Sequence, residues 1–225
     1  MKDIRLIEIG EEIHGENKAE AARVRKLLSA AGTGMLNLMA SPGAGKTSLI
    51  LKTLEGLAVH DAGRKAVRSA VIEADMDSLV DSEKISAAGV EAVQIRTGGF
   101  CHVDAWMVMK TLSAMDLAAV DLLFLENVGN LICPAQFDTG ARANVMILSV
   151  PEGDDKALKY PLMFRECEAL VVNKIDFLEL TDFDMEKLEQ RVKLLNSDMK
   201  IFPVSCRTGE GIGDWVDWVR SRFTL

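Results

Sequence analysis

Short apolar runs recur along this chain, and segments with apolar residues at helical spacing lie between most of them. The runs have the length of buried strands, and their valine, isoleucine and leucine content favours that assignment. Strands that alternate with helices are typical of a parallel sheet with helices on both faces. We therefore expect an α/β fold with strands at Met35–Met39, Ala70–Glu73, Ala92–Ile95, Asp121–Leu125, Val145–Val150, Ala169–Val172 and Lys200–Val204.

A further helix is predicted before the first strand. Residues Glu16–Ala31 carry apolar side chains at helical spacing, which would form a stripe that packs on the sheet. No linker, low-complexity stretch or internal repeat divides the chain. We expect a single domain over residues 1–225, in which residues 1–33 form an N-terminal extension and helix and residues 34–225 form the core.

Composition and charge narrow the range of functions. Hydrophobic residues make up 48% of the chain, enough for a full core, and the formal net charge is −8. A nucleic-acid-binding domain is more often basic, so we expect no nucleic-acid partner. No apolar run approaches the roughly 20 residues that span a bilayer, and the N-terminus lacks the apolar core of a signal peptide. We expect a cytoplasmic protein without membrane association, in which the four cysteines are free thiols or metal ligands.

The first predicted strand leads into Ala40–Thr47, which has the sequence Ala-Ser-Pro-Gly-Ala-Gly-Lys-Thr and precedes a helix-like run, Ser48–Leu57. In this context the segment predicts a P-loop, whose backbone N–H groups surround phosphate oxygens. Lys46 would reach the β- and γ-phosphates, and the Thr47 hydroxyl would hold Mg²⁺. The alternative is a chance match in an ordinary turn, and Ala40 replaces the usual glycine, which requires a backbone outside positive φ. The predicted nucleotide contacts are Gly43, Ala44, Gly45, Lys46, Thr47 and Ser48.

A second motif, Asn173-Lys174-Ile175-Asp176, follows the predicted strand Ala169–Val172 and is similar to the guanine-specificity motif of GTPases. The Asp176 carboxylate could accept hydrogen bonds from guanine N1–H and the exocyclic amine, whereas adenine offers no such pair of donors. A site that loses a required hydrogen bond can discriminate by about 10⁴-fold. Lys174 would lie along the base, and Asn173 would brace neighbouring loops. The alternative is a helix N-cap at Asp176. With the P-loop upstream, we interpret residues 34–225 as a GTP-binding core.

The last predicted strand is followed by Ser205-Cys206-Arg207-Thr208-Gly209, which resembles the second base-binding loop of GTPases. Cys206 and Arg207 stand where alanine and lysine are more usual. The backbone of the loop could still contact guanine O6. We include Ser205, Cys206 and Arg207 among the predicted nucleotide contacts.

Acidic residues follow two other strands. Asp75 and Glu126 should face the same edge of the sheet as the P-loop, because ligands of open α/β sheets bind beyond the carboxyl ends of the strands. We expect Thr47, Asp75 and Glu126 to hold Mg²⁺ directly or through water, although capping and turn formation are alternative roles. Gly129 could offer a backbone N–H to the γ-phosphate and pivot after hydrolysis.

Cys101, His102 and Cys133 follow strands that should end at this edge, and the two strands could be neighbours. Two thiolates and an imidazole suit a borderline-soft ion such as Zn²⁺ or Ni²⁺. The spacing matches no standard zinc finger, and a cysteine is often a small buried hydrophobe. Three ligands also leave a four-coordinate ion incomplete, so water or a two-fold dimer would have to complete the site.

Four segments together resemble the HypB family, the GTPases that help insert nickel into [NiFe]-hydrogenase. They are Ala40–Thr47, Thr97–Ala105, Glu126–Ala135 and Pro151–Pro161, and the resemblance extends from about Ala19 to Trp218. Many members carry a Cys-rich or His-rich nickel-binding extension, whereas this sequence has no cysteine before Cys101 and only His14 and His60 besides His102, so we expect no high-capacity nickel store.

The resemblance implies a P-loop GTPase that hydrolyses GTP to GDP and assists nickel delivery to a hydrogenase precursor with other maturation proteins. It also implies a homodimer, promoted by nucleotide or metal, with Cys101, His102 and Cys133 at its interface and Glu152–Lys156 near the nucleotide or the partner. Lys46, Asp75 and Glu126 are the predicted catalytic residues. No general base stands out, so slow turnover is expected. The alternatives are a maturation GTPase for another nickel enzyme such as urease, a P-loop small-molecule kinase, and a metal-storage protein.

Overall fold

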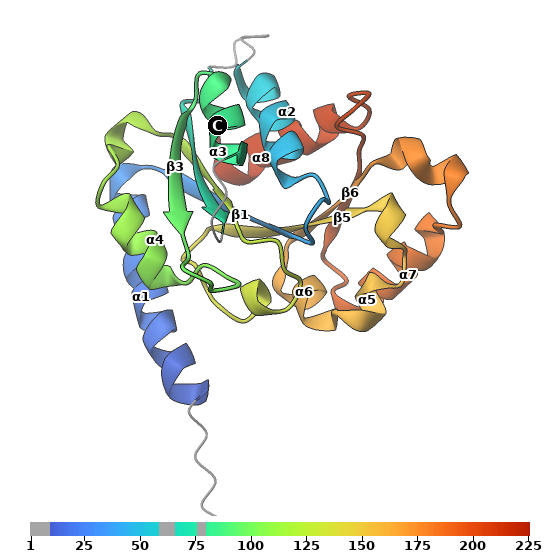
Figure 1. Cartoon of the computed structure of the whole chain (residues 1–225), viewed down its shortest axis with the longest axis horizontal. Coiled ribbons are helices and arrows are strands. Elements are labelled where there is room, and N and C mark those ends of the chain that lie inside the picture. The colour runs from blue at the N-terminus through green and yellow to red at the C-terminus, as the bar shows by residue number, and fades with distance from the viewer. Residues whose placement is uncertain (1–9, 59–65, 76–79) are drawn as a thin grey trace, which may run out of the picture.

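A parallel sheet of seven strands, in the order β3-β2-β4-β1-β5-β6-β7, forms the centre of the protein (Figure 1). The computed structural model describes residues 10–58, 66–75 and 80–225. All seven predicted strands are present, and their ends lie within two residues of the expected positions. The strands are β1 (Gly34–Ala40), β2 (Ser69–Asp75), β3 (Glu91–Arg96), β4 (Leu122–Glu126), β5 (Ala143–Ser149), β6 (Ala169–Asn173) and β7 (Lys200–Pro203).

Helices cover both faces of the sheet, as the alternation predicted (Figure 1). On one face lie α2 (Lys46–Ala58), α3 (Val80–Ala87) and α8 (Ile212–Phe223). On the other lie α1 (Gly10–Ala31), α4 (Ala105–Leu112), α5 (Lys156–Lys159), α6 (Pro161–Glu166) and α7 (Met185–Leu195). The short 3₁₀ helices are η1 (Leu117–Ala119), η2 (Cys133–Ala135), η3 (Val150–Glu152) and η4 (Ile175–Leu180). None of the helices in the described ranges is long and apolar enough to cross a membrane.

Strand β1 shows why both layers form. Its side chains alternate, so Leu36 and Leu38 pack under α2 and α8, whereas Met35 and Met39 pack against the helices of the other face. All four side chains are at most 1% exposed. A strand buried on both sides favours apolar residues on both faces, which explains the mostly apolar run, and its one polar residue, Asn37, is hydrogen-bonded to Asn127 and Asn144.

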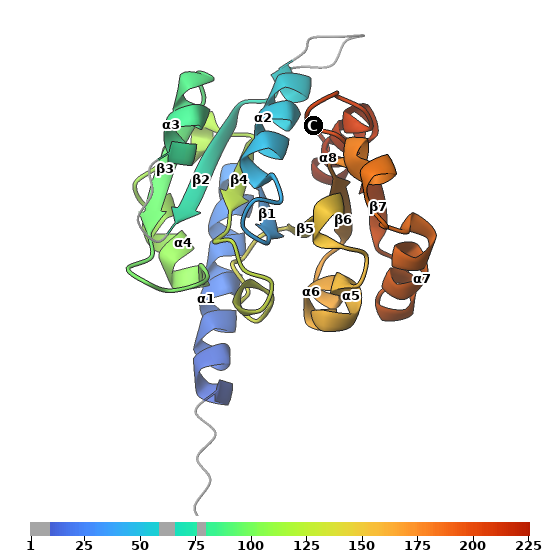
Figure 2. The ribbon, with the colours of Figure 1, turned by 45° about the vertical axis from the view of Figure 1, so that its right-hand side comes forward.

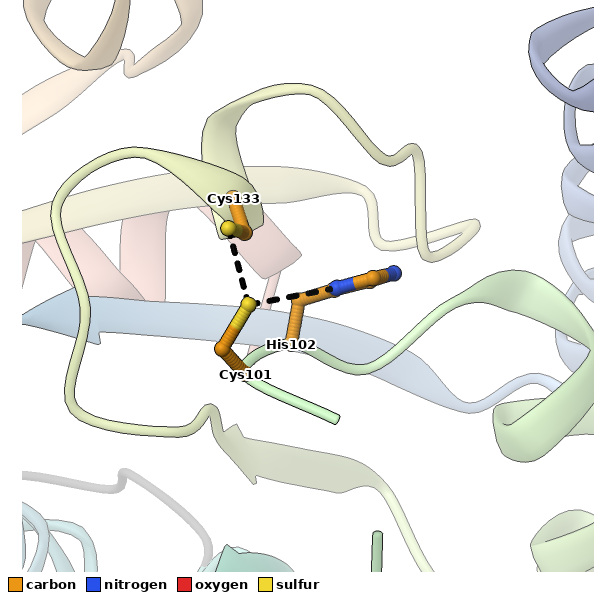
Figure 3. Close-up of side chains that lie close together, drawn as sticks. All are labelled: Cys101, His102 and Cys133. Carbon is orange, nitrogen blue, oxygen red and sulfur yellow. Dashed lines mark hydrogen bonds between the residues drawn. The ribbon is translucent and has the colours of Figure 1, made fainter. Parts of the chain in front are cut away.

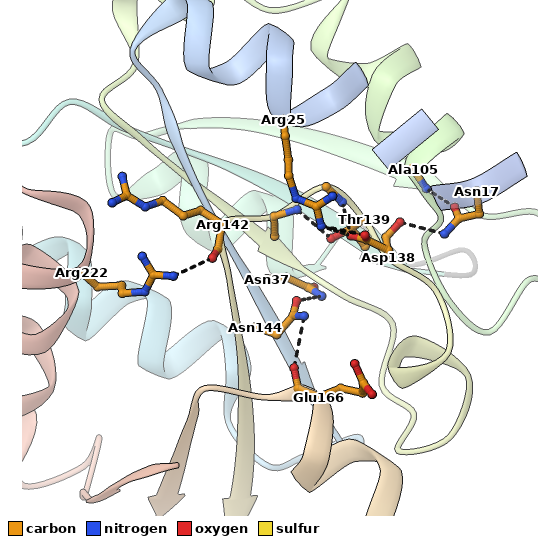
Figure 4. Close-up of polar contacts among 12 residues, drawn as sticks. Asn17, Arg25, Asn37, Ala105, Asp138, Thr139, Arg142, Asn144, Glu166 and Arg222 are labelled. Carbon is orange, nitrogen blue, oxygen red and sulfur yellow. Dashed lines mark hydrogen bonds and ion pairs between the residues drawn. The ribbon is translucent and has the colours of Figure 1, made fainter. Parts of the chain in front are cut away.

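Helix α1 begins at Gly10, six residues before the expected start, and its N-terminal part extends past the sheet (Figure 2). The Asn17 amide donates to the Asp138 carbonyl at 2.9 Å and accepts from the Ala105 N–H at 3.0 Å (Figure 4). About two turns of the helix further on, Arg25 donates to both carboxylate oxygens of Asp138, at 2.6 and 2.7 Å. These contacts tie the N-terminal helix to α4 and to the loop before β5.

Candidate nucleotide and metal site

The glycine-rich segment connects the end of β1 to the start of α2, where a P-loop is expected. Gly43 and Gly45 have φ values of 77° and 102°, a region that L side chains rarely adopt. A Cβ on Gly45 would also lie 2.3 Å from the Asn173 amide. Ala40, which replaces the usual glycine, closes β1 as a fully buried residue and is not among the described residues with positive φ, so its methyl group fits. Helix α2 begins at Lys46, which places the loop amides at a helix N-terminus.

Asn173, the last residue of β6, and Lys174, directly after it, contact the P-loop although β5 lies between β6 and β1. The Asn173 amide donates to the Ala44 carbonyl at 2.9 Å, and its oxygen accepts from the N–H groups of Lys174 and Cys206 at 2.8 and 3.2 Å. The Lys174 ammonium donates to the Gly43 carbonyl at 2.8 Å. Lys174 itself adopts a left-handed backbone with a φ of 64°. The bracing role expected for Asn173 is therefore present in the folded chain.

Asp176 lies in η4, and its carboxylate faces the loop after β7. Ser205 Oγ donates to one carboxylate oxygen at 2.5 Å, and Arg207 Nε donates to the other at 2.8 Å. The hydrogen bond from Ser205, together with that from Arg207, holds the pKa of Asp176 below its usual range. Asp176 does not cap the helix, since the N-cap position belongs to Lys174. The two predicted base-binding loops are thus in direct contact.

The Thr47 hydroxyl donates to Glu126 Oε1 at 2.9 Å, across from α2 to the end of β4. This hydroxyl and carboxylate match the oxygen chemistry that Mg²⁺ prefers. Asp75 ends β2, the strand beside β4, and is therefore at the same edge. Sequence reasoning missed Glu73, which is paired in register with Glu126 and is 3% exposed. Its position two residues before Asp75, on the same face of the strand, was the available signal.

The loop that follows Glu126 lies against the P-loop. An ideal Cβ on Gly129 would be 3.0–3.2 Å from atoms of Pro42, so the backbone of this loop approaches the P-loop more closely than a side chain would allow comfortably. The same loop continues to Cys133, the first residue of η2. One short segment therefore connects the Thr47–Glu126 pair to the thiol cluster.

Cys101, His102 and Cys133 come together although β2 separates the strands that precede them (Figure 3). The preceding strands, β3 and β4, are therefore not neighbours, because β2 lies between them in the sheet. Cys101 Sγ donates to Cys133 Sγ at 2.8 Å, and His102 Nδ1 lies 4.0 Å from Cys101 Sγ. One ligand atom from each residue lies within 4.8 Å of the others. Two thiol sulfurs and an imidazole nitrogen form a soft donor set that suits Ni²⁺ or Zn²⁺.

The surroundings of the cluster favour a neutral imidazole. His102 stacks on Phe137 with ring centroids 3.8 Å apart, and burial lowers the pKa of His102. The hydrogen bond that Cys133 shares with Cys101, together with burial, raises the pKa of the Cys133 thiol. Cys167 is fully buried, and Cys206 contacts Asn173 in the base loop, so both lie outside the cluster as predicted.

Buried amides connect the cluster to the nucleotide edge. The oxygen of Asn127 accepts from the Val103 N–H at 3.2 Å, and its amide donates to Asn37 Oδ1 on β1 at 3.1 Å. The amide of Asn130 donates to the Cys101 carbonyl at 3.3 Å. Asn127 is fully buried. Sequence reasoning missed these amides, because nothing in their spacing indicates which loop they contact.

A cavity of about 930 Å³ lies at the opposite edge of the sheet, where the strands begin. Its charged lining residues bind within the protein: Arg25 pairs with Asp138, Asp121 with Arg68, and Glu168 with Arg222. Arg222 also donates to the Arg142 carbonyl at 3.0 Å (Figure 4). None of the predicted site residues lies there.

Comparisons with known proteins agree with this arrangement. Residues 35–203 match the family model described as CobW/HypB/UreG, nucleotide-binding domain. Hydrogenase maturation factor HypB of Azotobacter vinelandii is 46% identical over 221 residues, which cover 98% of this chain and 71% of that protein. The crystal structure of HypB from Helicobacter pylori in complex with nickel has a TM-score of 0.86 and 33% identity, covering 93% of this chain and 95% of that one. HypB from Archaeoglobus fulgidus has a TM-score of 0.84 and 37% identity, covering 93% and 99%.

Proposed function

This chain belongs to the HypB family of hydrogenase maturation factors, and on that basis we propose that it is a GTPase whose nucleotide state controls a nickel site at Cys101, His102 and Cys133. The observation that carries the proposal is the loop that starts at Glu126, beside Thr47, and reaches Cys133, beside Cys101. A change in the bound nucleotide would shift the loop from Glu126 to Cys133 and so alter the positions of the two thiols.

The P-loop and Asp176 would bind GTP. Backbone N–H groups at the start of α2 and the Lys46 ammonium would stabilise charge on the transferring phosphoryl group. Thr47 and Glu126 would hold Mg²⁺, with Asp75 close by, and the ion would neutralise phosphate charge when bound. Asp75 would orient the attacking water. The carboxylates at this edge would be engaged with Mg²⁺ or would only orient water, and no residue is assigned as a general base, so intrinsic hydrolysis to GDP would be slow.

The thiol cluster would take up nickel as cargo. Its three protein donors leave a four-coordinate ion one ligand short, and a second copy of the chain could supply the remainder. Phe100 and Ile132, each directly before a thiol, are 58% and 55% exposed, and Trp106 on the adjoining helix α4 is 59% exposed. An apolar rim of this kind favours a homodimer that forms around the metal site.

Nucleotide and metal would influence one another. Gly129 contacts the P-loop and Asn130 contacts Cys101, so both sites share one loop whose position they bias. Such coupling is reciprocal in free energy: if GTP changes the affinity for nickel, nickel changes the affinity for GTP by the same factor. Nickel would then be released to a hydrogenase precursor, with other maturation proteins, in one nucleotide state. Zn²⁺ would compete for the same ligands.

The first test combines light scattering with metal titration, on GTP- and GDP-loaded protein with and without Ni²⁺ or Zn²⁺. We expect the dimer fraction of the wild type to depend on nucleotide and metal, and Cys101→Ser and Cys133→Ser to bind metal at least about 10-fold more weakly. Cys167→Ala, which removes a thiol outside the cluster, is the control. A wild type that stays monomeric in every state, or serine variants with full metal affinity, would refute the interfacial metal site.

The second test concerns the base. Asp176→Ala should weaken GTP binding by at least about 100-fold, because the guanine N1–H and amine lose their acceptor. Asp182→Ala removes the same charge from an exposed position nearby and should leave affinity unchanged. Titration calorimetry with GTP and ATP measures both variants. Equal GTP affinity in Asp176→Ala and wild type would show that Asp176 does not recognise guanine and would favour the alternative of a P-loop small-molecule kinase.

A further inference from the structure

Both oxygens of the Asp176 carboxylate already have partners in this structure. Ser205 Oγ binds one at 2.5 Å and Arg207 Nε binds the other at 2.8 Å. The Asp176 side chain is 7% exposed, whereas that of Arg207 is 72% exposed. The largely buried carboxylate is therefore held by two donors, the Ser205 hydroxyl and the guanidinium of the exposed Arg207 side chain.

The two donors differ in how firmly the fold holds them. Ser205 Oγ also accepts from the Thr208 N–H at 3.1 Å, and the Ser205 backbone bonds to Glu210 and Gly209 at 2.9 and 2.8 Å. The Arg207 guanidinium makes a single hydrogen bond among the described residues, to Asp176. Arg207 can therefore leave the carboxylate by side-chain rotation without breaking another of these hydrogen bonds, whereas rotation of Ser205 also breaks its contact with the Thr208 N–H.

Guanine places N1–H on one oxygen and its exocyclic amine on the other. Each carboxylate oxygen can accept two hydrogen bonds, so the small Ser205 hydroxyl can share its oxygen with N1–H, whereas the bulkier guanidinium of Arg207 competes with the amine for the second oxygen. We propose that Arg207 occupies the guanine-recognition carboxylate in the nucleotide-free protein and is displaced by the base, so that it lowers guanine selectivity rather than adding affinity. This inference rests on the proposed binding of guanine at Asp176. Lysine, which is more usual at this position, has no planar N–H directed in this way.

Binding of hypoxanthine distinguishes an effect of Arg207 on guanine selectivity from an effect on nucleotide affinity. It has N1–H but no exocyclic amine, so it engages one carboxylate oxygen and Arg207 can remain on the other. With Arg207 present, a bound hypoxanthine leaves no oxygen of Asp176 unsatisfied. Without Arg207, hypoxanthine leaves one oxygen unpaired, and guanine no longer has to displace an ion pair. Exposed ion pairs correspond to changes of about 2- to 5-fold in an equilibrium constant.

The experiment measures Kd for GDP and for inosine diphosphate by titration calorimetry, with Mg²⁺ at fixed ionic strength, on wild type, Arg207→Ala and Arg207→Lys. The ratio of the two Kd values cancels contributions from the phosphates and from net charge. We expect Arg207→Ala to raise the preference for GDP by about 2- to 5-fold, with Arg207→Lys between it and wild type. Lys193→Ala removes an exposed cation from α7 and should leave the ratio unchanged.

Each remaining outcome counts against the inference. If Arg207→Ala weakens both nucleotides equally, Arg207 stacks on the base or attracts the phosphates, and the competition model is wrong. A preference for GDP that is unchanged or smaller in Arg207→Ala rejects it as well. If the wild type binds GDP and inosine diphosphate equally, or neither, the guanine assignment of Asp176 fails, and the inference about Arg207 fails with it. Asp176→Ala distinguishes this last case, because it then has no effect.

Discussion

At the scale of single residues, the same side chain takes different roles in different surroundings, and the four cysteines show this. Cys101 and Cys133 share a hydrogen bond at 2.8 Å at the metal cluster. Cys167 is completely buried under α6, and burial raises its pKa strongly. Cys206 is half-buried in the base loop, where burial raises its pKa to about 11. Reactivity at each thiol therefore follows from its neighbours and not from its residue type.

This difference predicts the alkylation behaviour of Cys206. A pKa of about 11, compared with 9.0 for an ordinary thiol, leaves far less thiolate at pH 8. We expect carbamidomethylation of Cys206 to be about 100-fold slower in the native protein than in urea at that pH. The native rate should rise about tenfold per pH unit from pH 7 to 10, because the thiolate fraction rises with pH below the pKa. Peptide mass spectrometry gives the rates, and equal rates in native and unfolded protein would contradict the assignment.

At the scale of elements, α2 and α8 pack together over one face of the sheet and position the start of the P-loop helix. Trp215 on α8 is completely buried, and its indole N–H donates to Thr53 Oγ1 on α2 at 2.8 Å. The Thr53 hydroxyl in turn donates to the Leu49 carbonyl at 2.6 Å. A buried polar contact of this kind fixes how two apolar helices meet, because each unmade hydrogen bond is costly.

Trp215→Phe should therefore lower the free energy of unfolding by about 2–4 kcal/mol, from lost volume and from the lost hydrogen bond between the indole N–H and Thr53 Oγ1. Thr53→Val should cost about 1–3 kcal/mol, and the double variant should cost less than the sum. Urea unfolding measures all three. Trp218→Phe, at a half-buried position on the same helix, should cost less than Trp215→Phe. Strictly additive effects of the first two substitutions would show that the hydrogen bond has no role in packing.

Most of the strands and helices could be predicted from the pattern of apolar residues. Runs such as Val145–Leu148 are buried on both sides, and an unbroken apolar run has few other stable placements in a parallel fold. Helix ends were less predictable. Helix α1 begins at Gly10 rather than Glu16, because a helix can continue beyond the apolar stripe that packs on the sheet, and only that stripe is visible as a spacing pattern.

At the scale of the whole molecule, the sheet brings the nucleotide edge and the thiol cluster together. The P-loop, the Asp176 region, Glu126 and the cluster all follow the carboxyl ends of strands. Asn127 lies between them and contacts both Val103, next to His102, and Asn37 on β1. A displacement of the loop at Glu126 would therefore move the cluster.

Asn127→Ala should reduce the coupling between the two sites. We expect the ratio of nickel affinities in the GDP form and in a form with a non-hydrolysable GTP analogue to move several-fold toward one, because typical coupling factors are about 5- to 150-fold. Asn130→Ala, which removes the contact with Cys101, should act in the same direction. Asn144→Ala is the control, since its side chain joins the same amide chain but touches neither loop. A wild-type ratio in both test variants would show that the coupling uses another route.

The parallel α/β fold, the P-loop, the motif at Asn173–Asp176 and the resemblance to the HypB family were all accessible from the order of residues, because each depends on local spacing or on residues adjacent in the chain. The contact of Cys101 with Cys133 across β2, the binding of Arg207 to Asp176 and the pairing of Glu73 with Glu126 became known from the folded chain. The physical reason is that such contacts depend on strand order and on the packing of loops at the sheet edge, and hydrophobic periodicity specifies which face a residue occupies but not which strand lies next to it.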